Sequence, residues 1–517
     1  MVMGRATRDK RNRFAAPPWT QESPEWLALG QRLPADHLAR RVDRAVGLLD
    51  LEPLFASYLG VGKKALPPDL LLKVVVYEMH RKRPSPAQWV KDVRENEPLR
   101  WLLFGLEPSR ARLYDFRDRL APFWTAWNAE VLQVALAADL TPATRMALDG
   151  SSVAAHASRR QLLNEERLQK RRAVLDEHLE HLQQGEPVAT KPGWLAASVA
   201  GLREQKQRYE HAAEILQQRL QANAQRGSDK RKPPEKVLVS PSDPAAVLAR
   251  DKLNVFRPLY TPQLLRDLDS PLIFGFDVFT QNNDNGTVAP LIEQMVHQVG
   301  RQPKELFVDS GYVSLQHLEF CDLHDITVYG PVGENDFSAQ HHKKKQQNQH
   351  TALPKSAFRW HPEEQAYECP QGHRLHYTKT TTQARAESTV RLSLYVCPPE
   401  HCQACPRQPE CTRTPHKGRT VSRLEHEELV EALRERMQPD AAKKLYKLRS
   451  QTVELSYADL KEHRDLRRFH GRGLRRVRAE VGCLVVTHNL LHVESQVSRP
   501  PRAGPEKEEL AQTPCLT

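Results

Sequence analysis

The chain has 517 residues, of which 39% are hydrophobic and 27% charged, and its formal net charge is +12 at pH 7. This size and composition predict two or three globular domains, and the lack of any apolar run near the roughly 20 residues of a membrane span excludes an integral membrane protein. The positive charge favours a polyanionic partner, above all nucleic acid, over the simpler explanation of solubility alone.

The N-terminus and the cysteines indicate the compartment. The first residues, MVMGRATRDKRNRF, are basic but no apolar segment follows, which predicts a flexible arm over residues 1–30 and no secretory signal. Eight cysteines are too few for a disulfide scaffold, and four of them lie in one short segment, which favours a metal site in a reducing compartment. We therefore expect a cytoplasmic protein.

Residues 31–140 are expected to form a helical domain. Segments such as PPDLLLKVVVYEMH and SPAQWVKDVRENEPLRWLLF repeat apolar residues at i, i+3 and i+4. Pro67 and Pro86 stand where two of these helices begin. The basic residues of the domain either face DNA or belong to ordinary solvated helix faces, and the sequence leaves both interpretations open.

An isolated carboxylate follows this domain. RMALDGSS, which begins at Arg145, predicts a buried strand that carries Asp149 at its end. A carboxylate in such a position costs roughly several kcal/mol to desolvate unless a metal, an arginine or backbone donors lie beside it. The rest of the chain must therefore supply a partner for Asp149.

A helical hairpin with a linker is expected over residues 159–235. Apolar residues recur at alternating spacings of four and three along two arms, and glycines and prolines separate the arms. Arg172 and Lys206 interrupt the two seams, so we expect only modest packing between the arms.

The periodicity changes after residue 270. SPLIFGFDVFTQ, KELFVDSGY and HDITVYGPV predict strands, and the amphipathic TVAPLIEQMVHQVG between the first two predicts a helix. This alternation predicts an α/β layer with a partly parallel sheet. Asp309, like Asp149, ends an apolar strand and precedes a small residue and a glycine.

A cysteine-rich segment lies within residues 331–440. Cys402 and Cys405 form a C-x2-C pair, Cys411 follows shortly, and Cys369 could complete a tetrahedral zinc site. His373 and Cys397 are further candidate ligands, and free or redox-labile cysteines are the alternative. The sequence therefore predicts a zinc site without deciding its four ligands.

Residues 441–495 are expected to form one long helix that ends near His470, a GRG turn and a second helix with an apolar face. Glu454, Tyr457 and Lys461 share a face of the first helix. In isolation, ion pairs on a solvated helix explain this pattern as well as a functional site does. A disordered tail is expected over residues 496–517.

Three of these segments resemble, in order, the motifs of the DDE transposases of bacterial insertion sequences, in the subclass with a Tyr, Arg, Glu, Lys signature and an InsH-type N-terminal domain. LDGSSVAAHASR is similar to the first aspartate motif, LFVDSGYVSLQHL to the second, and YKLRSQTVELSYADLKEHRDLRRFHGRGLRRVRAE to the glutamate helix. The resemblance implies an α/β fold with an RNase H-like core, into which the helical hairpin and the Cys-rich segment are inserted. It also implies that Asp149, Asp309 and Glu454 form the catalytic triad.

Metal ions are implied by the same resemblance. Phosphodiester hydrolysis and the joining of the freed 3′-hydroxyl to a new phosphate are in-line displacements, in which two Mg²⁺ or Mn²⁺ ions bound by the triad would neutralise the developing charge. Such ions would also offset the desolvation of Asp149.

DNA is the implied partner, both as the terminal inverted repeats of the element and as the target. Recognition of the repeats is assigned by analogy to the helical N-terminal domain. A homodimer that brings two element ends together, associated with the bacterial nucleoid, is expected. The residues expected to contact DNA phosphates or nucleotides are Tyr446, Arg449, Lys461, Arg464, Arg467, Arg468, Arg472 and Arg475.

Two other functions fit much of this pattern. A metal-dependent nuclease with an RNase H fold would use the same triad without joining DNA. A catalytically silent DNA-binding protein derived from a transposase would keep the basic surface, but the three intact acidic residues argue against it.

Overall fold

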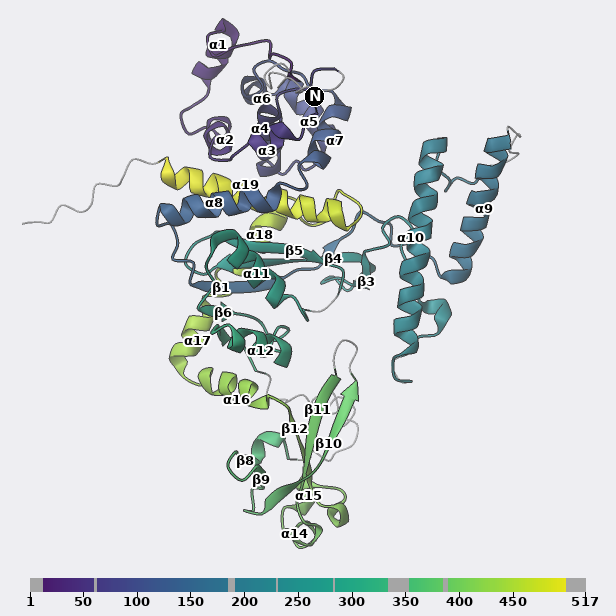
Figure 1. The fold of residues 1–517 in the computed structure, drawn as a ribbon, viewed down its shortest axis with the longest axis vertical. Helices are drawn as coiled ribbons and strands as arrows, with labels where there is room; N and C mark the ends of the chain where they lie inside the picture. Colours follow the sequence, from purple (N-terminus) through teal and green to yellow (C-terminus); the bar gives the residue numbers. More distant parts are fainter. Residues whose placement is uncertain are drawn as a thin grey trace, which may run out of the picture.

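The computed structural model describes residues 13–59, 63–184, 191–228, 231–281, 284–332, 353–384 and 389–498. N-terminal helices, a mixed sheet and a second sheet follow one another along the long axis of the molecule, and two helices stand to one side (Figure 1). Of the expected tail, residues 499–517 lie outside the described ranges, and the final helix continues to Val497. No helix within those ranges is both long and apolar enough to cross a membrane.

The N-terminal region consists of helices, as the periodicity predicts. Prolines occupy the first turn of five of them, where a missing N–H costs no hydrogen bond. The expected flexible arm is corrected from residue 13 onward, because Trp26 stacks on Trp101 at 5.2 Å and holds a helix against the domain. Residues 1–12 lie outside the described ranges. The helices are α1 (Pro24–Arg32), α2 (Leu38–Val46), α3 (Glu52–Ala56), α4 (Pro68–His80), α5 (Pro86–Glu95), α6 (Glu97–Leu102) and α7 (Arg110–Arg119).

The central sheet is mixed. Strand β4 pairs antiparallel with β5 on one side and with β1 on the other, and the short strands β2 and β3 extend these pairings along its first half. Beyond β1, strands β6 and β7 add in parallel. The strands are β1 (Arg145–Gly150), β2 (Val153–Ala154), β3 (Val247–Arg250), β4 (Phe256–Asp267), β5 (Ile273–Phe279), β6 (Glu305–Phe307) and β7 (Thr327–Tyr329).

Strand β4 is the longest of the sheet and the one that the sequence hides. Its Pro258 and Pro262 argue against a central strand, because proline cannot donate to the ladder. Their carbonyl oxygens nevertheless accept bonds from Ala155 N at 3.0 Å and from Ser151 N at 3.1 Å. The two prolines therefore lie in the part of β4 where its neighbours change, and their positions require only a backbone carbonyl acceptor and no N–H donor.

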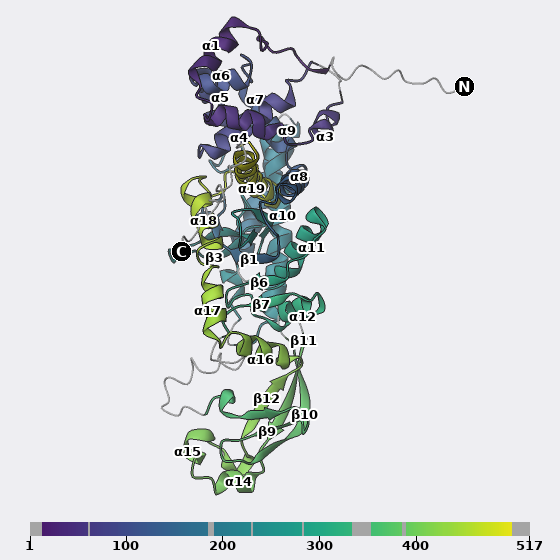
Figure 2. The same cartoon turned by 90° about the vertical axis from the view of Figure 1, so that its left-hand side faces the viewer.

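Helices cover both faces of the sheet. Helix α18 (Val453–Glu462) lies on one face, and α11 (Val288–Val299) and α12 (Leu315–Leu323) lie on the other (Figure 2). Helices α8 (Trp124–Ala137) and α19 (Leu474–Val497) lie between the sheet and the N-terminal helices (Figure 1). Glu494 of α19 is buried and pairs with Arg41 and Arg44 of α2, at 3.1 and 2.6 Å, which fastens the N-terminal region to the core.

The long helix expected before the GRG turn is wrong: two helices occupy this segment. Helix α17 (Asp440–Lys447) ends before a turn, and α18 begins at Val453. The backbone leaves the helical conformation at Thr452 (φ −120°, ψ −78°). This break separates Arg449 from the helix that carries Glu454, so the two side chains approach the sheet independently.

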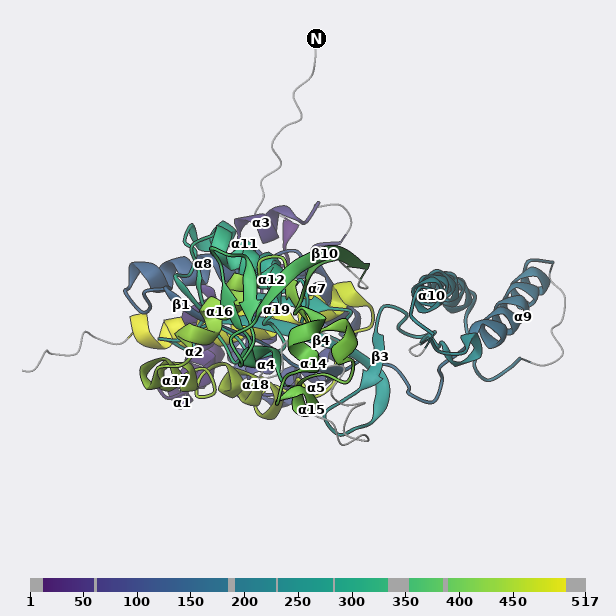
Figure 3. The same ribbon diagram turned by 90° about the horizontal axis from the view of Figure 1, so that it is seen from below.

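The hairpin consists of α9 (Glu165–Gln184) and α10 (Val199–Ala224), which project sideways from the core (Figure 3). Leu168, Leu175 and Leu179 of α9 are buried against α10, whereas Leu182 is 40% exposed. The basic residue of the second seam is neutralised, because Lys206 Nζ lies 2.6 Å from Asp176 Oδ1.

The Cys-rich segment contains a second, antiparallel sheet, which was not expected from the sequence. Its strand order is β12-β11-β10-β9-β8. Helix α16 (Glu427–Arg436) leads from it back to α17. The strands are β8 (Arg359–His361), β9 (Ala366–Glu368), β10 (Arg374–Ala384), β11 (Thr389–Val396) and β12 (Thr420–Leu424), and the short helices α14 (Pro399–Gln403) and α15 (Gln408–Cys411) precede β12.

Glu78 in α4 makes the stability of the N-terminal region depend on pH. Burial, together with the neighbouring Asp92, raises its pKa from 4.5 to about 8. The folded protein therefore holds a proton that the unfolded chain loses above about pH 4.5, and stability falls as pH rises towards 8. The free energy of unfolding of Glu78→Gln minus that of the wild type should therefore be larger at pH 8.5 than at pH 5, by on the order of 3 kcal/mol. Denaturant unfolding at both pH values measures this, with the exposed Glu95→Gln as control; a difference that does not change with pH would refute it.

Candidate active site

Asp149 and Asp309 emerge side by side from neighbouring strands. Strands β1 and β6 are parallel, and Ala147 of β1 faces Phe307 of β6. Each aspartate comes two residues after this pair, at the carboxyl end of strands that run about 4.8 Å apart. The two strand-end carboxylates that the sequence singles out therefore lie at one edge of the sheet.

Arg449 compensates for the burial of the Asp149 carboxylate. The side chain of Asp149 is 18% exposed, and Arg449 Nη2 donates a hydrogen bond of 3.0 Å to its Oδ1. Burial raises the pKa of Asp149, the charge of Arg449 opposes this rise, and the charge of Asp309 adds to it. The arginine is itself buried and also donates to Leu148 O at 3.2 Å. A fixed guanidinium therefore supplies the counter-charge that the sequence requires beside Asp149.

Glu454 approaches the aspartates through the same arginine. Its Oε1 lies 3.8 Å from Arg449 Nη1, and its side chain is 57% exposed in the first turn of α18. Tyr446 lies among all three carboxylates: burial raises the pKa of its hydroxyl, Arg449 lowers it, and the charges of Asp309, Glu454 and Asp149 raise it further. In the described part of the chain, no three His, Cys, Asp or Glu side chains are grouped so that they could hold a metal ion.

Other residues near the triad fasten helices to the sheet. Tyr446 Oη donates to Val308 O at 3.1 Å, and Lys461 Nζ donates to Ser151 Oγ. Tyr457, to which the sequence gave no role, is buried with its hydroxyl 2.7 Å from a carbonyl oxygen of β4. These contacts position α18, which carries the glutamate, and α17, whose end leads into the turn that carries Arg449.

Asp284 is a fourth carboxylate at this edge, and the sequence analysis missed it. Its Oδ1 accepts a hydrogen bond from Gln263 Nε2 at 2.9 Å. A Cβ atom at Gly311 would lie 2.6 Å from Asp284 Oδ2 and 3.0 Å from Asp309 Oδ1, so both carboxylates converge on this glycine. Because β5 runs parallel to β1 and β6, an acid in the loop after β5 has to lie at the same edge. The position of Asp284 after an apolar strand is visible in the sequence, but the direction of that strand follows only once β4 is recognised between β5 and β1.

The negative charges of Asp284 and Asp309 are expected to repel each other and so to destabilise the folded protein. Burial raises the pKa of Asp284, its bond from Gln263 lowers it, and the charge of Asp309 raises it. We expect Asp284→Asn to stabilise the protein by on the order of 1 kcal/mol at pH 7 without divalent cations, because the amide keeps the Gln263 bond and removes the like charge. Added Mg²⁺ should stabilise the wild type more than this variant in thermal unfolding. Asp322→Asn, on the exposed side of α12, is the control, and equal Mg²⁺ effects on all three proteins would contradict the expectation.

Two parts of the chain match known protein families. Residues 27–119 match the family described as "Transposase domain (DUF772)", and residues 368–493 match the "Transposase DDE domain". Together they indicate an insertion-sequence-type transposase. Comparisons with curated proteins and with solved structures gave no match. The DDE match includes Glu454, and the two aspartates lie between the matched segments.

The arginines expected to contact DNA do not form one stripe. Arg464 is buried, with its Nε 2.9 Å from Asp459 Oδ2, and Arg467 pairs with Glu462. These two arginines fix the turn after α18, and Arg464 is not accessible to DNA. The remaining members of the group stand at exposed positions, namely Arg468, Arg472 and Arg475.

The cysteines of the Cys-rich segment lie in one small core at the far end of the second sheet. Cys369, Cys397, Cys402 and Cys411 pack in the same apolar cluster. Burial raises the pKa of the Cys397 thiol, and the neighbouring Cys402 adds to the rise. Arg419 N donates to Cys402 Sγ at 3.3 Å. The charge of Cys405 also acts on Cys411, so all five thiols belong to one region.

Proposed function

We propose that this protein is a DNA transposase that cleaves phosphodiester bonds at the ends of an insertion sequence and joins the freed 3′ ends to target DNA, with Asp149, Asp309 and Glu454 as its catalytic residues. The observation that carries the proposal is that Asp149 and Glu454, from separate elements, lie 3.0 and 3.8 Å from the one guanidinium of Arg449, while Asp309 follows the strand parallel to and beside that of Asp149. The two family matches support the same reaction class.

The strand order supports an RNase H-like core. Strands β5, β4, β1, β6 and β7 lie in this order, with the first three antiparallel and the last three parallel. Asp149 then belongs to the central strand, Asp309 follows its neighbour, and Glu454 lies on a helix packed on β1. This is the placement that the resemblance implies for the triad.

The acidic side chains are of the chemical type that binds Mg²⁺ or Mn²⁺, because Asp149, Asp309, Glu454 and Asp284 offer only hard oxygen donors. Among the described residues no three of them are grouped closely enough to hold an ion, so binding requires the side chains to move together. Burial is the main cause of the raised pKa of Asp149 and of Asp284, and the charge of Asp309 adds to both, which a bound cation would offset. Two bound ions would neutralise charge on the attacking and leaving oxygens of the in-line displacement. Arg449 opposes the rise in the pKa of Asp149 and so favours its ionised form, and Tyr446 and Lys461 keep α17 and α18 against the sheet.

A structural zinc ion is proposed for the insertion, held by four of its five cysteines, with Cys369, Cys402, Cys405 and Cys411 as the first candidates. Convergence of thiols from the turn after β9, the end of β11 and the two short helices supports it. Purified protein should contain about one zinc ion per chain, and Cys402→Ser should lose it together with the resistance of the second sheet to proteolysis. Elemental analysis measures the content, with Cys321→Ala as control. A zinc-free wild type that resists proteolysis would refute the site.

The reaction is tested with purified full-length protein, labelled duplexes that carry the inverted repeats flanking the gene, a target plasmid and Mg²⁺. Joined products support the transposase. Cleaved products without joining indicate a metal-dependent nuclease, and a complex without chemistry indicates a silent DNA-binding protein. The joined products should form in a complex that contains two protein chains, because two ends must be held together.

A further inference from the structure

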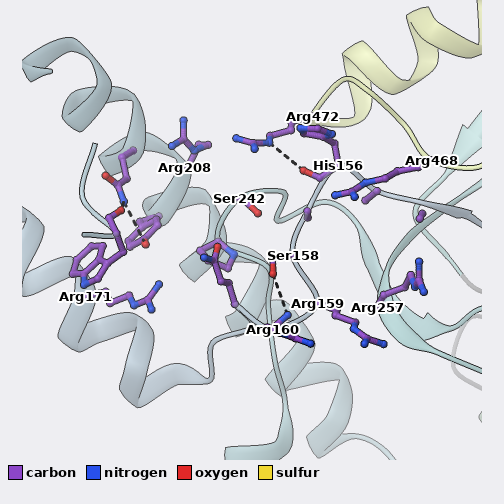
Figure 4. Close-up of a pocket in the computed structure, with 18 of the residues that line it drawn as sticks. His156, Ser158, Arg159, Arg160, Arg171, Arg208, Ser242, Arg257, Arg468 and Arg472 are labelled. Carbon is purple, nitrogen blue, oxygen red and sulfur yellow. Dashed lines mark hydrogen bonds between the residues drawn. The ribbon is translucent and has the colours of Figure 1, made fainter. Parts of the chain in front are cut away.

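A cavity of about 730 Å³ separates the helical hairpin from the core (Figure 4). The loop after β2 and the turn before α19 form one wall, and α9, α10 and the residues Gly193 and Trp194 that precede α10 form the other. No aspartate or glutamate is among the described residues that line it. Its lining instead contains seven arginines: Arg159, Arg160, Arg171, Arg208, Arg257, Arg468 and Arg472.

Much of this positive charge is not neutralised by the protein. Within the described ranges, no carboxylate forms an ion pair with Arg159, Arg160 or Arg468, and all three are exposed. His156, on the same wall, responds to this field: burial lowers its pKa first, and Arg472 and Arg468 lower it further. Arg208 and Arg257 do pair with carboxylates, Glu204 and Asp251, each at 3.0 Å. The five other guanidinium groups around the cavity raise the local concentration of anions, phosphates in particular.

The hairpin wall is held in a fixed position. Arg219 of α10 is half-buried at the base of the hairpin and donates to Leu238 O at 2.9 Å and to Ala246 O at 2.8 Å. Trp194 stacks on Tyr209 at 6.1 Å, and Arg171 lies over the indole ring at 5.0 Å. The cationic groups are therefore presented by ordered elements on both sides of the cavity.

The distance from the cavity to the triad follows from strand register. Asp149 faces Leu264 of β4, and Ala154, at the edge of the cavity, faces Leu259 of the same strand. Five residues of strand span about 17 Å. B-form DNA rises 3.4 Å per base pair, so this distance corresponds to about five base pairs.

We propose that this cavity, the hairpin pocket, binds the sugar-phosphate backbone of duplex DNA about five base pairs from the scissile phosphate. The proposal rests on the proposed function, since the scissile phosphate is the one placed at the triad. Arginine forks grip phosphate oxygens bidentately and without regard to base sequence. The hairpin insertion thus acts as a clamp that holds DNA in line with the active site.

Binding of a mixed-sequence duplex, followed by fluorescence anisotropy across a salt series, tests the clamp. We expect the triple variant Arg159→Gln, Arg160→Gln, Arg468→Gln to lose at least about ten-fold in affinity and to reduce the salt slope by about three. The control, Arg167→Gln, Arg203→Gln, Arg226→Gln, removes the same charge from exposed hairpin positions outside the pocket and should keep the wild-type slope. Equal losses in both triples would overturn the proposal. If the triple variant does not fold, Arg160→Gln and Arg468→Gln are measured singly, each with a slope change of about one.

A second measurement locates the contact. On a duplex that the wild type cleaves, neutral methylphosphonate linkages about five base pairs from the cleaved bond should weaken binding of the wild type and not of the triple variant. If methylphosphonates weaken binding only at other positions, the proposal is overturned. It is also overturned if single-stranded RNA or inorganic phosphate displaces the labelled duplex more effectively than unlabelled duplex DNA does. If the wild type joins DNA and the triple variant binds DNA as tightly as the wild type, the clamp is refuted and the proposed function is not. Absence of both binding and joining in the wild type refutes the proposed function.

Discussion

Asp149→Asn is expected to lower strand cleavage and joining by about a thousand-fold, which corresponds to roughly 4 kcal/mol of transition-state stabilisation. The substitution changes almost nothing else. The amide oxygen can still accept the bond that Arg449 Nη2 makes to Oδ1 at 3.0 Å, and the backbone of β1 stays paired with β4 and β6. What is lost is one negative charge at the strand end, where the proposed metal ions need it.

The test compares single-turnover cleavage of labelled duplexes by three proteins. The control is Asp269→Asn, because Asp269 pairs with Arg145 at the opposite end of β1 and is far from the proposed chemistry along that strand. The control should cleave like the wild type, and both variants should bind DNA and unfold like it. Intact joining by Asp149→Asn would show that the catalytic assignment is wrong.

Local patterns predicted much of the fold. The helices of the N-terminal region, the hairpin arms and strands β1, β5, β6 and β7 all follow from apolar periodicity, because each buries one face against its nearest neighbours. Strand β4 did not follow, since Pro258 and Pro262 are tolerated only because its pairing partners change along its length. The second sheet was missed although Leu392, Leu394 and Val396 alternate with polar or aromatic residues along β11. Its partner β10 is a nearly continuous polar run, so apolar periodicity did not show that the two strands pair.

The site was predictable only in part, for a related reason. Asp149 and Asp309 stand out because a carboxylate after an apolar strand is costly, and that local signal needs no tertiary information. Asp284 became visible only when the direction of β5 was known. The helix break at Thr452 was hidden because the segment around it has helical periodicity, whereas the turn there brings Arg449 against a strand 300 residues earlier in the chain, a contact that local sequence cannot show.

Arg449→Met is expected to destabilise the protein by about 3 kcal/mol at pH 7, because it leaves Asp149 buried without its counter-charge. The loss should shrink on acidification. Without the arginine the pKa of Asp149 rises further above that of the unfolded chain, so the variant loses stability as pH rises and approaches the wild type at low pH, where the carboxyl group is neutral in both states.

A double-mutant cycle separates this electrostatic effect from lost packing. If the buried charge causes the damage, adding Asp149→Asn to Arg449→Met should restore most of the stability, and the coupling between the two positions should be on the order of 2 kcal/mol. Denaturant unfolding at pH 5 and pH 8 measures it, with Arg145→Met as control, since its ion pair with Asp269 is one-fifth to one-third exposed and should contribute about 1 kcal/mol or less. Additive effects of the two substitutions would mean that Arg449 supports the site by packing and not by charge. In that case divalent cations, and not the arginine, would have to stabilise ionised Asp149.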